Sequence, residues 1–182
     1  MEYQTYLFRN ERNTLNQAQV VHRAFMKASQ IDEAHRFALK VIVGPLNKAG
    51  LYQTLLNKCL PPICETEDRQ IRVEAPGQTG KQYHHIGQYE TALSYLKQLL
   101  AIRQKIGDTA GLCPTLFNMG HIYRQRNEQN EALSAWVTVY GLAKPMGLAQ
   151  AFEALERLAG QLNMDGGLAA WERLAQQMEK TG

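Results

Sequence analysis

Residues 77–96, GQTGKQYHHIGQYETALSYL, are repeated in modified form at residues 115–136, TLFNMGHIYRQRNEQNEALSAW. Both stretches contain Ala-Leu-Ser, at residues 92–94 and 132–134, so the two copies are offset by about forty residues. An internal repeat with such a period predicts a stack of similar helical or sheet units, each of which buries its apolar face against its neighbours.

Glycine and tyrosine recur at a helical spacing in the first half of each copy. Gly80 precedes Tyr83 by three residues, and Gly120 precedes Tyr123 in the same way. Residues three apart share one face of an α-helix. We therefore expect each glycine to lie on the inner face of a first helix, where the missing side chain lets a second helix approach closely.

Turn and packing residues follow in both copies. Gly87 in the first copy and Asn127 in the second are expected to end the first helix, because both residue types tolerate the left-handed conformation of a helix C-cap. Ala92 and Ala132 then stand where the second helix is expected to cross the first. Each copy is therefore predicted to be a pair of antiparallel helices.

The two copies resemble the tetratricopeptide repeat. The residues that carry this resemblance are Gly80, Tyr83, Gly87, Tyr89, Ala92, Gly120, Tyr123, Ala132 and Trp136. The second copy departs from the family pattern at Asn127 and Gln129, where a glycine and an aromatic residue are usual. The resemblance implies an all-α fold, a right-handed superhelical solenoid of antiparallel helix pairs. The long period resembles the repeats of kinesin light chains and of the C-terminal arms of bacterial signalling ATPases.

Periodicity extends the helical prediction over most of the chain. The expected helices span residues 11–29, 32–49, 51–63, 68–86, 89–106, 109–126, 130–142, 148–162 and 168–180. Gly44-Pro45 is expected to kink the second helix, Pro76 to start or bend the fourth, and Pro114 to lie in a first turn. We divide the chain into a loose arm (1–10), degenerate repeats (11–67), two well-matched repeats (68–147) and a shortened repeat with a capping helix (148–182).

Composition argues against several functional classes. The net charge of +3 is spread along 182 residues, so it gives little reason to expect a nucleic acid partner. No apolar run is long enough to cross a membrane, and the first residues lack the layout of a secretory signal. The three cysteines, Cys59, Cys64 and Cys113, are an odd number and are expected to be reduced. These features favour a cytoplasmic protein.

Three fragments could suggest catalysis or metal binding, and each is incomplete. Residues 75–82, APGQTGKQ, lack the first glycine and the final Ser or Thr of a phosphate-binding loop. The cysteine and histidine spacings do not provide the two close ligand pairs of a structural zinc site. Cys113 and His121 on one helix would be about 12 Å apart, too far for proton transfer. We expect no catalytic residue, metal or cofactor.

The resemblance implies a binding surface, because the first helices of successive tetratricopeptide repeats line a concave groove. Carried over residue by residue, the groove would contain Lys81, His84, His85, Phe117, His121, Arg124, Gln125, Phe152 and Glu156. Interleaved basic and aromatic residues favour a peptide segment or partner helix with acidic groups and an apolar anchor. Lys81 and Asn118 suggest only part of a clamp for a terminal carboxylate.

Alternatives remain open at this point. Lys81 and Arg124 could be solvated charges, and Phe117 and Phe152 could pack between repeats. The chain could instead be a sensory or oligomerising arm of a larger signalling ATPase or, less in keeping with its scattered charge, an RNA-binding helical repeat. Homo-oligomerisation is also open. The sequence therefore favours a non-catalytic protein-interaction module with a groove.

Overall fold

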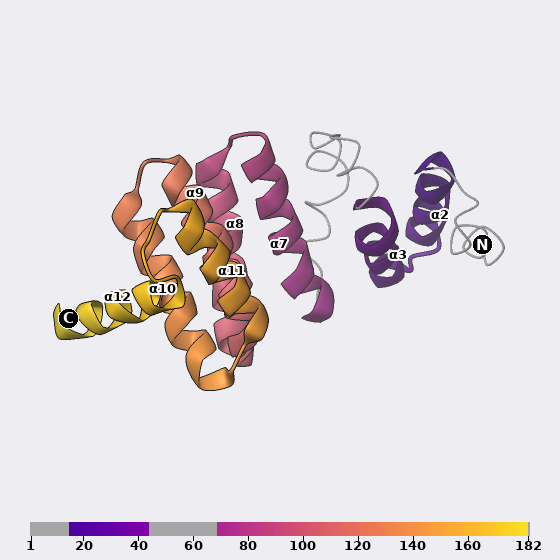
Figure 1. Cartoon of the computed structure of the whole chain (residues 1–182). Helices are drawn as coiled ribbons and strands as arrows, with labels where there is room; N and C mark the ends of the chain where they lie inside the picture. Colours follow the sequence, from indigo (N-terminus) through magenta and orange to yellow (C-terminus); the bar gives the residue numbers. More distant parts are fainter. Residues whose placement is uncertain (1–14, 44–68, 182) are drawn as a thin grey trace. The chain divides into compact units, whose positions relative to one another are not determined.

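The computed structural model describes residues 15–43 and 69–181 (Figure 1). The α-helices in these ranges are α2 (Leu15–Lys27), α3 (Ile31–Phe37), α7 (Arg69–His85), α8 (Tyr89–Ile106), α9 (Thr109–Gln125), α10 (Gln129–Met146), α11 (Ala149–Gln161) and α12 (Leu168–Thr181). One π-helix, η1 (Ala38–Ile42), follows α3. The predicted arm, the kink at Gly44-Pro45 and the helix over 51–63 lie outside the described residues.

The chain divides into two compact units, Met1–Tyr95 and Leu96–Gly182. The boundary falls inside α8, so this helix contributes its first residues to one unit and the rest to the other.

In the first unit, α2 packs against α3 and η1. Their contact includes the rings of Phe25 and Phe37, with centroids 5.8 Å apart. Ser29 takes a left-handed conformation (φ 56°) in the turn between the two helices. The single helix predicted from residue 32 is instead α-helical to Phe37 and then π-helical. The spacing of apolar residues could not distinguish an α-helix from a π-helix here, because a single widened turn leaves neighbouring apolar residues on the same face.

Pro76 lies inside α7, which runs through it from Arg69 to His85. The sequence allowed a helix that starts at the proline or bends there; the structure starts the helix about two turns earlier. Pro114 likewise lies in the second turn of α9, not in the first as expected, because Asp108 caps the helix and accepts a hydrogen bond from the Gly111 amide at 2.9 Å. Both prolines are tolerated at the cost of one helical hydrogen bond each.

The predicted left-handed helix ends are confirmed. Gly87 has φ 75° and Asn127 has φ 63°. The amide that follows each of them donates back to a tyrosine carbonyl, Tyr83 or Tyr123, at 2.9 Å in both cases. This pairing is the Schellman motif, which satisfies a carbonyl that the end of a helix leaves without a partner.

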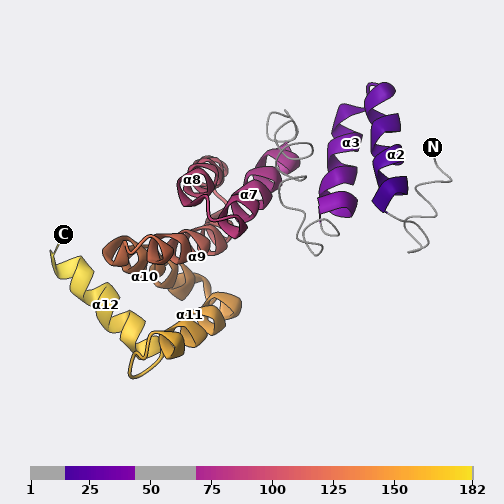
Figure 2. The same cartoon turned by 90° about the horizontal axis from the view of Figure 1, so that it is seen from above.

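The second unit is built on α9 and α10, which pack against each other along their length, with α11 and α12 against α10. Figure 2 shows α11 and α12 meeting at the turn that joins them. Trp136 on α10 and Trp171 on α12 form the centre of the core, 1% and 0% exposed, with ring centroids 6.2 Å apart in an edge-to-face arrangement. Such pairs add specific geometry to apolar burial.

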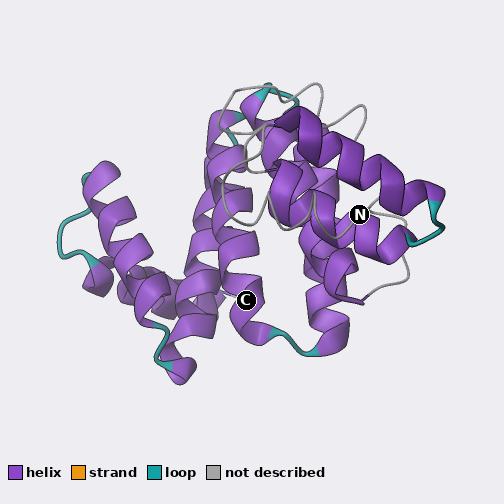
Figure 3. Cartoon of the chain, turned by 90° about the vertical axis from the view of Figure 1, so that its right-hand side faces the viewer, coloured by secondary structure: helices purple, strands orange, loops and turns teal. Residues whose placement is uncertain are grey.

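The described residues contain helices and short loops and no strand (Figure 3). The alanines expected at the helix crossings, Ala92 and Ala132, are both fully buried. The predicted all-α helical-repeat fold is thereby confirmed.

Candidate functional site

The nine residues predicted to line a groove come from three helices. Lys81, His84 and His85 are at the end of α7, in the first unit. The other six are in the second unit, four on α9 and two on α11.

The α7 group consists of Lys81, His84 and His85, and part of it packs against neighbouring side chains. Lys81 and His85 are exposed, whereas His84 is half-buried, with its ring 5.8 Å from that of Tyr89 and 5.9 Å from that of His85. Burial, and next the nearby His85, lower the pKa of His84 below its ordinary value. His84 is therefore neutral at pH 7 and offers hydrogen bonding and not charge.

The α9 group forms a connected aromatic cluster. The ring of His121 lies edge-on to Phe117 at 4.8 Å and to Trp136 at 5.4 Å. Phe117 and His121 are half-buried, so each still presents part of its surface to solvent. Arg124 lies one turn further along the helix, half-buried, and Gln125 is exposed. Phe117, His121 and Arg124, spaced four and three residues apart, share one side of α9.

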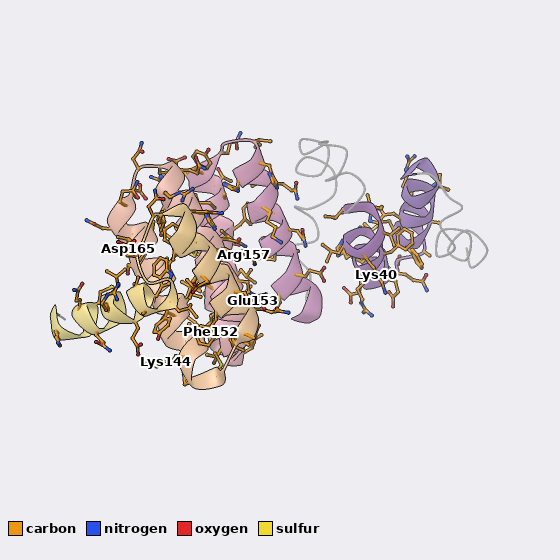
Figure 4. The ribbon with its side chains drawn as sticks, viewed as in Figure 1. Lys40, Lys144, Phe152, Glu153, Arg157 and Asp165 are labelled. Carbon is orange, nitrogen blue, oxygen red and sulfur yellow. The ribbon has the colours of Figure 1, made fainter. Side chains whose placement is uncertain are left out.

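The two α11 residues have packing and capping contacts. The Phe152 ring lies 6.1 Å from that of Tyr140 and packs against the core. Glu156 accepts a hydrogen bond at 2.8 Å from the backbone amide of Leu168, the first residue of α12. Figure 4 labels Phe152 together with Glu153 and Arg157, which are exposed on α11 one turn apart. The contacts of Phe152 correspond to the alternative in which this ring packs between repeats and does not line a groove.

A pocket that the sequence did not predict lies between α9 and α11, and we call it the α9–α11 pocket. Its volume is about 500 Å³. It is lined by Ala110, Cys113, Pro114, Phe117, Asn118, Val139, Gly147, Leu148, Ala149, Gln150, Ala151 and Ala154. Of the nine predicted groove residues, only Phe117 lines it. Four of the lining residues are alanines, from α9 and α11, and their short side chains leave this space open. Nothing local in the sequence indicates that these two helices border one pocket.

Cys113 contributes a thiol to the lining of this pocket. It is 3% exposed, and burial raises the pKa of its thiol above the ordinary value. The thiol is therefore protonated at neutral pH and is a weak nucleophile. It forms part of an apolar wall.

The parts of the chain that the structure describes contain neither a candidate metal site nor a candidate membrane-spanning helix. Within residues 15–43 and 69–181, no group of three or more histidine, cysteine, aspartate or glutamate side chains comes together to hold a metal ion. None of the described helices has the length and apolarity needed to cross a bilayer.

Comparison with known proteins adds one finding. Residues 78–135, from the second half of α7 to the first turns of α10, match the family described as tetratricopeptide repeat. No curated protein matches the sequence. Repeats of this family generally mediate interactions between proteins and are generally not catalytic.

Proposed function

We propose that this chain is a protein-interaction module without catalysis of its own, which binds a peptide segment or helix of another protein along its first helices. The observation that carries the proposal is the tetratricopeptide match over residues 78–135, which contains α8 and α9 entire. Within that stretch, α9 presents Phe117, His121 and Arg124 along one side.

The side chains of α9 suit such a surface because they are already ordered. His121 is held between Phe117 and Trp136, and the Trp136 indole is itself hydrogen-bonded to the backbone of α9. Groups whose rotamers are fixed before binding lose little conformational entropy when a partner arrives. We propose that the aromatic surface contacts an apolar residue of the partner while Arg124 pairs with an acidic one.

A pair of matched variants tests the proposal. The groove variant carries Lys81→Ala, His84→Ala, His121→Ala and Arg124→Ala. The control variant carries Lys97→Ala, Gln98→Ala, Gln104→Ala and Lys105→Ala, all exposed positions on α8. Both remove two cationic side chains, so a general loss of positive charge affects them equally. Circular dichroism first establishes that each keeps its helices.

The measurement is affinity capture from native lysate with the intact chain and both variants. We expect a partner that the intact chain and the control variant retain and the folded groove variant loses. Equal retention by all three proteins would show that the partner binds elsewhere. Separate Arg124→Ala and His121→Ala variants then divide the effect between charge and the aromatic cluster.

A further inference from the structure

The α9–α11 pocket reaches from the surface to the core of the second unit. Ala110, Pro114 and Asn118 form its α9 wall, and Ala151 and Ala154 its α11 wall. Cys113 and Val139 also line it, and these side chains are only 3% and 1% exposed. A molecule that fills this pocket would therefore be in contact with the core.

The lining selects against charge. None of the lining residues, all of which are described, is an aspartate, glutamate, lysine, arginine or histidine. Asn118, Gln150 and the Cys113 thiol supply its polar side-chain atoms. An ionised group placed there would lose hydration and find no charged side chain to pair with. The occupant that fits is uncharged and mainly apolar.

Size and polarity together distinguish a small molecule from a peptide. A volume of about 500 Å³ is larger than any one amino-acid side chain fills and lies within the usual range for small-molecule sites. A stretch of peptide main chain would bring an amide and a carbonyl for each residue, and each would need a partner. The lining side chains offer only two carboxamides and a thiol for this purpose. A compact molecule with one or two polar groups can be satisfied.

One helical hydrogen bond of α9 is missing beside the pocket. Pro114 has no amide hydrogen, so it cannot donate to the carbonyl of Ala110, four residues earlier on α9. Both residues line the pocket. A ligand with a single N–H or O–H group could supply the donor that the proline lacks.

We propose that the α9–α11 pocket is a binding site for an uncharged, largely apolar small molecule that carries one hydrogen-bonding group. Its α9 wall continues the side of that helix that carries the partner-binding surface proposed above, and Phe117 borders both. The two sites are nevertheless separable by mutation, because His121 and Arg124 do not line the pocket. The small-molecule site assigns a role to Cys113, Asn118 and the facing alanines, which the protein-interaction function leaves unused.

N-phenyl-1-naphthylamine and its 8-sulfonate are the probes for this proposal, because they differ by one sulfonate group, which adds a negative charge. Fluorescence titration of the full chain should show saturable binding of the neutral compound at one site. The sulfonate should bind with a Kd at least about tenfold higher, since no cationic side chain lines the pocket to pair with its charge. Equal affinity for the two compounds, or no saturable binding of the neutral one, overturns the proposal.

Two pocket-filling variants locate the site. Ala154→Phe fills the pocket from α11 and Ala110→Trp fills it from α9, and each should raise the Kd of the neutral probe at least about tenfold. Ala101→Phe, at an exposed position on α8, is the control and should leave the Kd unchanged. Unchanged binding in both folded filling variants places the probe elsewhere and also overturns the proposal.

A measurement on the unfilled pocket guards against variants that fail to fold. In a Cys59→Ser, Cys64→Ser background, Cys113 is the remaining thiol. Because Cys113 is 3% exposed, 5,5′-dithiobis(2-nitrobenzoate) reaches its sulfur only when this region opens. Saturating neutral probe should slow the reaction at least about tenfold, because a bound ligand stabilises the closed state. An unchanged rate contradicts the proposal, while the lysate capture with the groove variant remains a separate test of protein binding.

Discussion

The indole Nε1 of Trp136 donates a hydrogen bond to the backbone carbonyl of Phe117 at 3.1 Å, which ties the second helix of one pair to the first. Trp171 repeats the arrangement in the next pair, where its Nε1 donates to the carbonyl of Leu155 at 2.9 Å. Both indoles are buried, so each N–H must find a partner inside the protein. The tryptophans therefore fix the position of each helix pair as well as filling space.

Gly120 makes room for this indole, and a methyl group there should destabilise the second unit. A Cβ on Gly120 would overlap the Trp136 ring, which is itself confined by the core. Gly120→Ala should lower the free energy of unfolding by about 1–3 kcal/mol, the usual cost of overpacking. Urea unfolding followed by tryptophan fluorescence measures this.

Gly141→Ala is the matched control. Gly141 lies in the next helix, α10, and a Cβ there meets nothing within 4 Å. The helix preference of alanine should stabilise this variant by about 0.5–1 kcal/mol. Equal effects of the two substitutions would mean that close approach to Trp136 is not the reason for glycine at position 120.

Glu156 should act on the stability of α12 and not on partner binding. Its carboxylate accepts from the Leu168 amide at the start of α12, where negative charge is also favoured by the helix dipole. Glu156→Ala should cost about 0.5–1 kcal/mol in unfolding free energy. Glu153→Ala, also exposed on α11, should cost less than about 0.5 kcal/mol. If Glu156→Ala greatly reduced the amount of captured partner without lowering stability, the residue would instead be part of the partner-binding groove.

The contrast between Gly87 and the α9–α11 pocket shows what the sequence could predict. Gly87 and Asn127 were predictable because a left-handed helix end is a local property of residue type. The pocket depends on Ala110 and Ala154, distant in sequence, facing each other across space that neither fills. The capping role of Glu156 was missed for a similar reason, since its partner amide is on another helix. The conformation of a helix end depends on residues close in sequence, so it could be predicted. A pocket or a tertiary hydrogen bond depends on residues far apart in sequence, so it could not.

Stability of the α2–α3 helix pair should fall as the pH drops below neutrality. His35 is 4% exposed, and neither its Nδ1 nor the Nε2 of His22 has a hydrogen-bond partner. Burial lowers the pKa of both; His35 lowers that of His22 further, whereas Asp32 opposes the effect at His35. The unfolded chain, with histidine pKa values of about 6.5, therefore binds protons more readily than the folded pair. The stabilisation is complete above that pH and is lost as the pH falls from it toward the lowered pKa values.

Histidine NMR titration of the full chain measures these pKa values directly. Both should titrate below the ordinary histidine value, and hydrogen-exchange protection of residues 31–42 should be lower at about pH 5.5 than at about pH 7.5. His35→Gln removes one titrating group and should weaken this pH dependence. If His22 and His35 both titrated with ordinary pKa values, the explanation that burial keeps them neutral would be contradicted.

Arg103 should contribute to stability by joining the end of α8 to the start of α9. Its Nη1 donates to the carbonyl of Gly111 and to the Thr115 hydroxyl, at 2.7 Å for the hydroxyl, and its Nε lies 3.4 Å from the Asp108 carboxylate. Arg103→Met keeps much of the apolar stem but removes these partners, and should lower the free energy of unfolding by about 1–3 kcal/mol.

Thr115→Val provides the matched test of this contact, because it removes only the hydroxyl that Arg103 reaches. In a double-mutant cycle on urea unfolding, the two substitutions together should cost less than the sum of the single costs, with a coupling of about 0.5–3 kcal/mol. Lys105→Met, at an exposed position near the end of the same helix, controls for the loss of one positive charge and should change stability by less than about 0.5 kcal/mol. Strict additivity at residues 103 and 115 would show that the guanidinium does not hold the two helices together through this hydroxyl, leaving the Gly111 carbonyl and Asp108 as its effective partners.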